Sequence, residues 1–77
     1  MTKDKVKEIV ADVLRCDIHS LADSSGILTQ FGWDSLAHIE IITSIEDAFH
    51  IKVDDADIGN ILTIEAISAY IESKLRR

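Results

Sequence analysis

Apolar residues recur along this chain with the spacing of an α-helix, and this periodicity restricts its fold more than any other feature. The first stripe consists of Val6, Ile9, Val10, Val13 and Leu14. These positions are i, i+3, i+4, i+7 and i+8, which lie on one face of a helix. The stripe therefore predicts an amphipathic helix from about Lys3 to Cys16.

A second stripe predicts a helix that begins at Asp34 or Ser35 and ends near His50. At 100° per residue, its core face consists of Ile41, Ile42, Ile45 and Phe49. The opposite face consists of Leu36, Glu40, Thr43 and Asp47, with Ile39 and Glu46 at its edge. Two large apolar residues thus lie among carboxylates outside the core stripe, which favours a docking patch.

The C-terminal third predicts a short helix and a longer one. Asp54 or Asp55 is suited to cap the short helix, which we expect to contain Ile58 and Ile61. Thr63 is suited to cap the last helix, whose apolar positions are Ile64, Ile67, Ile71 and Leu75. No segment shows the alternation of a strand or the turn of a hairpin. We therefore predict an all-α fold: a four-helix bundle of three longer helices and one short helix.

The segment from Asp17 to Trp33 lacks this periodicity and predicts a long loop between the first two helices. Its apolar residues, which we expect to anchor it on the core, are Ile18, Leu21, Ile27, Leu28 and Phe31. A loop of this length in a small domain is commonly functional.

The length of 77 residues predicts one domain, 1–77, with one core. No apolar run approaches the length that crosses a membrane. The N-terminus leads into a helical pattern without the apolar segment of a secretion signal. We therefore expect a cytoplasmic monomer without membrane insertion.

The formal net charge of −6 is concentrated in one stretch. Cys16 through Ile51 contains no Lys or Arg but holds Asp17, Asp23, Asp34, Glu40, Glu46 and Asp47. The other eight acidic residues balance the eight Lys and Arg. Binding to a phosphate backbone needs clustered cations, so we expect no nucleic-acid partner. The acidic stretch indicates either a partner with a basic surface or a solvated face that keeps the protein soluble.

The sequence predicts neither a metal site nor a disulfide bond. Cys16 has no second cysteine, which predicts a reduced and partly buried thiol, and Cys16 with His19 supplies too few ligands for zinc. A calcium loop beginning at Asp55 fails because Asn60 and Ala66 occupy the positions that require Gly and Glu. We expect no metal site.

The motif Gly32-Trp33-Asp34-Ser35-Leu36 places a hydroxyl group at the start of the second helix. Gly32 permits a backbone turn, and Asp34 and Ser35 are both suited to cap the helix. A hydrolytic serine needs a general base and an oxyanion hole, and the spacing Gly-x-Ser-x-Gly fails because position 37 is Ala. We therefore predict that the chain is not an enzyme.

With these residues the chain resembles the acyl carrier protein family, in which Gly-x-Asp-Ser-Leu opens the second helix of a four-helix domain. Other matching segments are Ile45-Glu46-Asp47-Ala48-Phe49, Val53-Asp54-Asp55 and Leu62-Thr63, together with Tyr70. The resemblance covers nearly the whole chain. It implies that Ser35 accepts 4'-phosphopantetheine from coenzyme A through a phosphopantetheinyl transferase, and that the thiol of this arm then carries acyl groups as thioesters.

The resemblance also implies which residues meet partner enzymes. Asp34 is expected to cap the helix and to contribute to recognition. The partner face would consist of Leu36, Ile39, Glu40, Thr43, Glu46 and Asp47. The implied partners are the transferase and acyl-loading, synthase or acyltransferase enzymes with basic docking surfaces.

Trp33, His38 and Thr43 depart from many fatty-acid carriers. Together with the absence of any linker to a synthase module, they predict a free-standing carrier in a specialised fatty-acid, polyketide or related pathway. His38 lies on the core side of its helix, which favours a packed, hydrogen-bonded histidine, and Trp33 is either a loop anchor or a lid beside the arm. The alternative function is a small acidic helical interaction module without a covalent cofactor.

Overall fold

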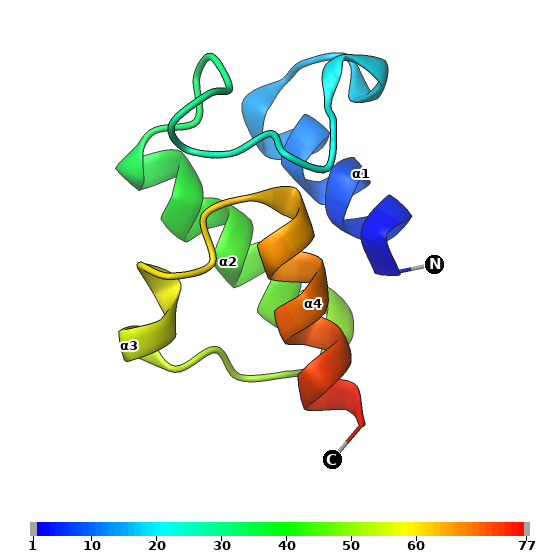
Figure 1. Ribbon diagram of the computed structural model, residues 1–77, viewed down its shortest axis with the longest axis vertical. Coiled ribbons are helices and arrows are strands. Elements are labelled where there is room, and N and C mark those ends of the chain that lie inside the picture. Colours follow the sequence, from blue (N-terminus) through cyan, green and yellow to red (C-terminus); the bar gives the residue numbers. More distant parts are fainter. Residues whose placement is uncertain (1, 77) are drawn as a thin grey trace.

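The computed structural model describes residues 2–76 and contains four α-helices and one 3-10 helix within them. The elements are α1 (Thr2–Leu14), η1 (Ile18–Ser20), α2 (Ser35–Phe49), α3 (Asp55–Ile58) and α4 (Ile64–Leu75) (Figure 1). Three helices are long and one is short, so the predicted all-α architecture is confirmed. No helix in the described range is long and apolar enough to span a bilayer.

Two helices end at residues with left-handed backbone geometry. Arg15 has a φ of 56°, so α1 ends at Leu14 and the prediction of Cys16 was two residues too long. His50 has a φ of 55° and its N–H donates to the Glu46 carbonyl, which ends α2 at Phe49. Glycine usually occupies the left-handed position that follows a helix. Neither Arg15 nor His50 is glycine, so the sequence carried no glycine signal for the ends of α1 and α2.

The short helix is smaller than predicted. It ends at Ile58, and Ile61 lies beyond it in the segment that leads to α4. Ile61 is nevertheless buried. Its apolar spacing from Ile58 therefore reflects a shared core and not a shared helix.

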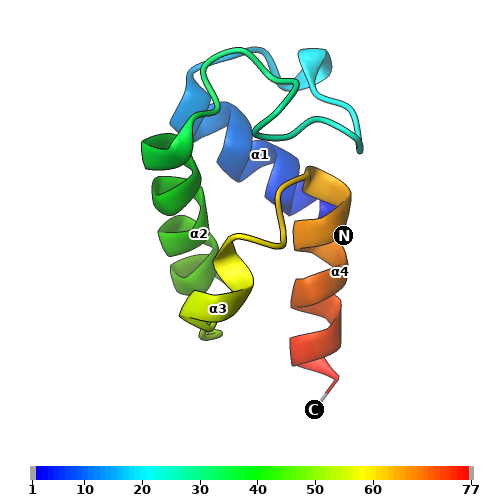
Figure 2. The ribbon, with the colours of Figure 1, turned by 60° about the vertical axis from the view of Figure 1, so that its left-hand side comes forward.

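The core is built where α1 packs against both α2 and α4. Figure 2 shows α1 spanning the space between these two helices, with α3 near their other end. The most deeply buried side chains are Val6, Val10, Ile41, Ile45, Ile64, Ile67 and Ile71. All seven were predicted as core positions from the helical period.

The long loop folds over the N-terminal end of α4 (Figure 1). Gly26 and Thr63 form an isolated antiparallel bridge, and the Ile27 N–H donates to the Leu62 carbonyl at 3.1 Å. A Cβ atom at Gly26 would collide with that carbonyl, so the close approach requires glycine here. The sequence contained no hairpin signal for this single bridge.

The apolar residues of the loop do not all serve as anchors. Leu21 is buried and Ile27 packs against the core, as predicted. Leu28 and Phe31 are instead 88% and 96% exposed, so the prediction was wrong for both. Hydrogen-bonded turns at 26–30 and 30–33 direct these two side chains outward.

Candidate functional site

A tight turn leads into α2. The Trp33 N–H donates to the Gln30 carbonyl at 3.1 Å, and Gly32 has a φ of 85°. A positive φ at the third residue is the requirement of a type II turn, which glycine meets without strain. The turn therefore has Phe31 and Gly32 at its tip.

Trp33 fixes the end of this turn in the core. Its side chain is 2% exposed, and its indole N–H donates to Nδ1 of His38 at 3.0 Å. Because Nδ1 accepts, the neutral ring carries its proton on Nε2, which donates to the Ile58 carbonyl at 3.0 Å. The predictions of a loop-anchoring Trp33 and a hydrogen-bonded His38 are confirmed. Together these residues join the turn, α2 and α3.

Ser35 is the first residue of α2 and is exposed. Asp34 precedes it with extended backbone geometry, and its Oδ1 accepts a hydrogen bond from the Ala37 N–H at 2.8 Å. This is the cap that the sequence predicted. None of the hydrogen bonds found within residues 2–76 uses the N–H of Ser35 or Leu36. The start of α2 therefore presents a hydroxyl and two backbone donors to solvent.

The start of α4 differs from that of α2. The Ile64 N–H donates to the Ser25 carbonyl at 3.0 Å, and the Glu65 N–H donates to the Asp23 carbonyl at 2.9 Å. The third donor, the Ala66 N–H, binds Oγ1 of Thr63. The long loop and the cap thus satisfy the first donors of α4, whereas those of α2 stay open.

The polar side chains close to Ser35 along the chain form hydrogen bonds with other groups and not with its hydroxyl. Both ring nitrogens of His38 are engaged in the core, and Oδ1 of Asp34 accepts the capping hydrogen bond. A serine nucleophile needs a free general base within hydrogen-bond reach. Among residues 2–76, no hydrogen bond is found between the Ser35 hydroxyl and such a base.

The outer face of α2 continues from the serine. Leu36 and Ile39 are 69% and 56% exposed, and Glu40, Thr43 and Asp47 are exposed as well. Glu46 is only half-exposed, because its Oε2 accepts a hydrogen bond from the Val53 N–H at 2.8 Å. Five of the six predicted partner residues thus lie open, and Glu46 also supports the segment before α3.

The acidic stretch is partly neutralised by α1. Lys3 and Lys7 place their Nζ atoms 3.0 and 3.2 Å from the Asp23 carboxylate. Their hydrogen bonds hold the pKa of Asp23 below its ordinary value, and the hydrogen bond to Asp23 raises the pKa of Lys3. The position of Asp23 in the sequence had indicated that it adds to the excess negative charge around Ser35. Its pairing with Lys3 and Lys7 shows that its charge is compensated. The other five acidic residues of the stretch remain.

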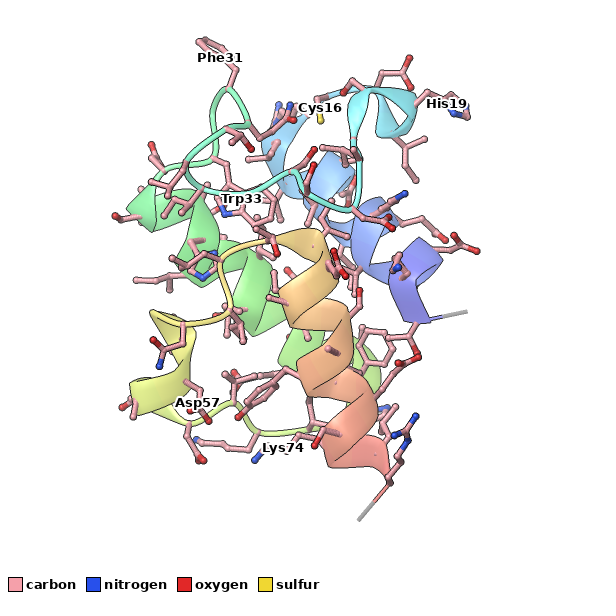
Figure 3. All side chains as sticks on the ribbon, viewed as in Figure 1. Cys16, His19, Phe31, Trp33, Asp57 and Lys74 are labelled. Carbon is pink, nitrogen blue, oxygen red and sulfur yellow. The ribbon has the colours of Figure 1, made fainter. Side chains whose placement is uncertain are left out.

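Cys16 is a free, partly buried thiol, as predicted. Within residues 2–76, no three His, Cys, Asp or Glu side chains are grouped to hold a metal ion. In Figure 3, Cys16 lies near the end of α1 and His19 lies in η1 at the upper right of the view.

Comparison with known proteins relates this chain to one family. The sequence profile described as the phosphopantetheine attachment site matches residues 4–71. The acyl carrier protein of Thermotoga maritima is 37% identical over 71 residues, which cover 92% of this chain and 88% of that protein. The acyl carrier protein of Desulforapulum autotrophicum is 38% identical over 71 residues, or 91% of this chain and 92% of its own length. The solution structure of a holo acyl carrier protein from Nitrosomonas europaea superposes with a TM-score of 0.83 at 31% identity, covering 97% of this chain and 96% of that one.

Proposed function

This chain belongs to the acyl carrier protein family, and from that premise we propose that Ser35 is the residue that carries its prosthetic arm. The protein is a carrier and not an enzyme, and its covalent cofactor is 4'-phosphopantetheine. When bound, this group supplies a terminal thiol that holds acyl groups as thioesters. The observation that supports Ser35 is its exposed position at the open start of α2, within the Gly-x-Asp-Ser-Leu motif.

The residues around Ser35 fit a phosphodiester at this position. Attachment joins the Ser35 oxygen to the phosphorus that bears pantetheine and breaks the bond from that phosphorus to the oxygen that bridges the two phosphates of coenzyme A. It releases adenosine 3',5'-bisphosphate and the hydroxyl proton. Because His38 and Asp34 are engaged, a base in the transferase accepts that proton. The free N–H groups of Ser35 and Leu36 and the positive end of α2 favour the resulting anion. Gly32 leaves open space beside the site, since a Cβ atom there would meet nothing within 4 Å.

Intact-protein mass spectrometry tests the assignment. The protein is incubated with coenzyme A and a broad-specificity phosphopantetheinyl transferase, and a mass increase of one phosphopantetheine is expected. S35A should fold like the parent and gain no mass. S24A, which removes an exposed loop serine outside the motif, is the matched control and should be modified normally. An unmodified parent would favour the alternative of an acidic interaction module, and a modified S35A would move the attachment site elsewhere.

Members of this family work with synthases and acyltransferases. For this chain we propose that such enzymes and the transferase dock, through basic surfaces, on Leu36, Ile39, Glu40, Thr43, Glu46 and Asp47. Exposed apolar area flanked by carboxylates supports this surface, because complementary charge orients the partners and apolar contact then retains them.

We also propose a specialised fatty-acid, polyketide or related pathway. The unusual Trp33 and His38 are buried and act on the fold, so they bear little on partner choice. Thr43 supports the proposal, because it is exposed in the middle of the α2 face, where its hydroxyl donates to the Ile39 carbonyl. Growth complementation of a strain that lacks its general fatty-acid carrier should fail, and efficient rescue would contradict the proposal.

A further inference from the structure

Most of the exposed apolar side chains of this protein lie close to Ser35 in the sequence. Within residues 2–76, the large hydrophobic residues that are exposed are Leu28, Phe31, Leu36, Ile39 and Leu75. Four of these five lie between positions 28 and 39, and Phe31 is the most exposed at 96%. Single exposed apolar residues are ordinary on protein surfaces, but a group of them marks a contact site.

Phe31 is held in a defined place by hydrogen bonds on both sides. Before it, the N–H groups of Thr29 and Gln30 both donate to the Gly26 carbonyl, at 3.1 and 2.8 Å. After it, the turn closes through Trp33, which is locked in the core by its bond to His38. An aromatic ring on a braced turn loses little conformational freedom when a partner covers it. The hydrogen bonds on both sides of Phe31 therefore keep its side chain exposed.

Phe31 also lies within reach of any protein that acts on Ser35. It precedes Ser35 by four residues, so their Cα atoms are at most about 14 Å apart. A protein partner of standard size covers roughly 800 Å² on each side, equivalent to a disc of about 16 Å radius. Figure 3 shows Phe31 projecting from the loop, away from the body of the molecule. A partner centred on Ser35 therefore extends to this ring.

We propose that the turn at 30–33 is a second docking element, in which Phe31, supported by Leu28, enters an apolar pocket of the transferase that modifies Ser35. The turn precedes the serine in the chain and the α2 face follows it, so the enzyme contacts both sides of its target. The chain has no Lys or Arg from Cys16 through Ile51, so the pocket is expected to have a basic rim. This proposal rests on the proposed function of Ser35.

Steady-state kinetics of Ser35 modification test the proposal. F31A should lower kcat/KM about tenfold, mainly through KM, as truncation of a buried aromatic contact does. L28A should have a smaller effect in the same direction. L75A removes a 53% exposed apolar residue from the end of α4 and is the matched control, with wild-type kinetics expected. The melting temperature and the salt dependence should stay at wild-type values in all three variants, because no core contact or charge is lost.

The possible outcomes separate the two proposals. A parent protein that gains no mass would contradict the function proposed for Ser35. A modified parent with equal kcat/KM for F31A and L75A would overturn the docking element alone. Phe31 could instead contact a second copy of the chain. Sedimentation of the unmodified protein tests this alternative. A dimer that F31A dissociates would also overturn the proposal, and a monomer supports it.

Discussion

Asp23 shows how a single residue can change its electrostatic role through folding. Its carboxylate accepts hydrogen bonds from Lys3 and Lys7, which lower its pKa. The lowered pKa means that this pairing stabilises the fold above the ordinary carboxyl pKa, and that the stabilisation is lost as the pH falls through the pKa of Asp23. All three side chains are accessible, so the effect on stability is small.

We therefore predict a measurable titration shift at Asp23. NMR titration of its carboxyl carbon should give a pKa below the ordinary value of an aspartate, which serves as the reference. Replacing both Lys3 and Lys7 with Ala should raise the pKa of Asp23 towards that reference. An unchanged pKa in the double variant would mean that the lysines do not pair with Asp23 in solution.

His38 is the residue whose loss should affect the fold most directly. H38L leaves the indole N–H of Trp33 and the carbonyl of Ile58 without their partner, in or next to the core. Unsatisfied groups of this kind cost about 1–3 kcal/mol each, so we expect the free energy of unfolding to fall by about 2–6 kcal/mol. Urea denaturation followed by circular dichroism measures this change.

A double-mutant cycle with W33F identifies the cause. Because W33F removes the indole donor, H38L should cost less in the W33F background than in the parent. Additive costs in the double variant would show that the Trp33–His38 hydrogen bond contributes nothing.

At the scale of the helices, the outer face of α2 should depend on charge and on apolar area in different ways. Reversing Glu40 and Asp47 to Lys should slow modification of Ser35 and flatten its dependence on salt, because these side chains steer association. L36A should weaken the complex and preserve that salt dependence, because it removes apolar area worth about 25 cal/mol per Å². Rates measured across ionic strength distinguish the two effects.

The matched control for the reversal changes Glu8 of α1 and Glu72 of α4 to Lys. It alters the net charge of the protein by the same amount as the reversal on α2. Glu46 is left intact because its hydrogen bond to Val53 would confound the result. Equal rates for the two reversed proteins at low salt would mean that only the net charge matters and that α2 is not the docking face.

The helix α3 is a single turn and depends on side chains from other helices. The Tyr70 hydroxyl of α4 donates to Asp57 at 2.9 Å, and His38 of α2 binds the Ile58 carbonyl. Tyr70 also accepts a hydrogen bond from the Asp54 N–H at 3.4 Å, so Y70F removes two hydrogen bonds. We predict that it makes the amides of Asp57 and Asn60 exchange with deuterium at least about twofold faster. The amides of the α4 core positions should keep their protection, and equal acceleration there would indicate global destabilisation.

For the whole molecule, the net charge of −6 predicts that salt stabilises the fold. The open carboxylates of α2 repel one another, and screening at about 0.15 M ionic strength reduces this repulsion. The melting temperature should therefore rise from low to moderate salt, as measured by calorimetry. E40Q with D47N should show a smaller rise. A melting temperature that stays constant or falls would mean that pairs such as Lys3–Asp23 already compensate the charge.

Features that depend on neighbours in the chain could be predicted from the order of the amino acids. The helical period gave α1, α2 and α4 and their buried positions, because side chains three or four residues apart share a face of a helix. The Asp34 cap and the exposure of Ser35 were equally predictable, since capping joins residues three apart. Together with the family resemblance, these local features were enough to indicate the candidate site.

Contacts between positions far apart in the chain became known only from the folded structure. Asp23 meets Lys3, His38 meets Ile58, and Gly26 meets Thr63, at separations that carry no periodic signal. These contacts set the path of the long loop, and that path left Phe31 exposed where its apolar character had predicted burial. The hydrophobicity of a side chain sets the free energy gained on its burial. Whether that side chain is buried depends on how residues far away in the chain hold its backbone.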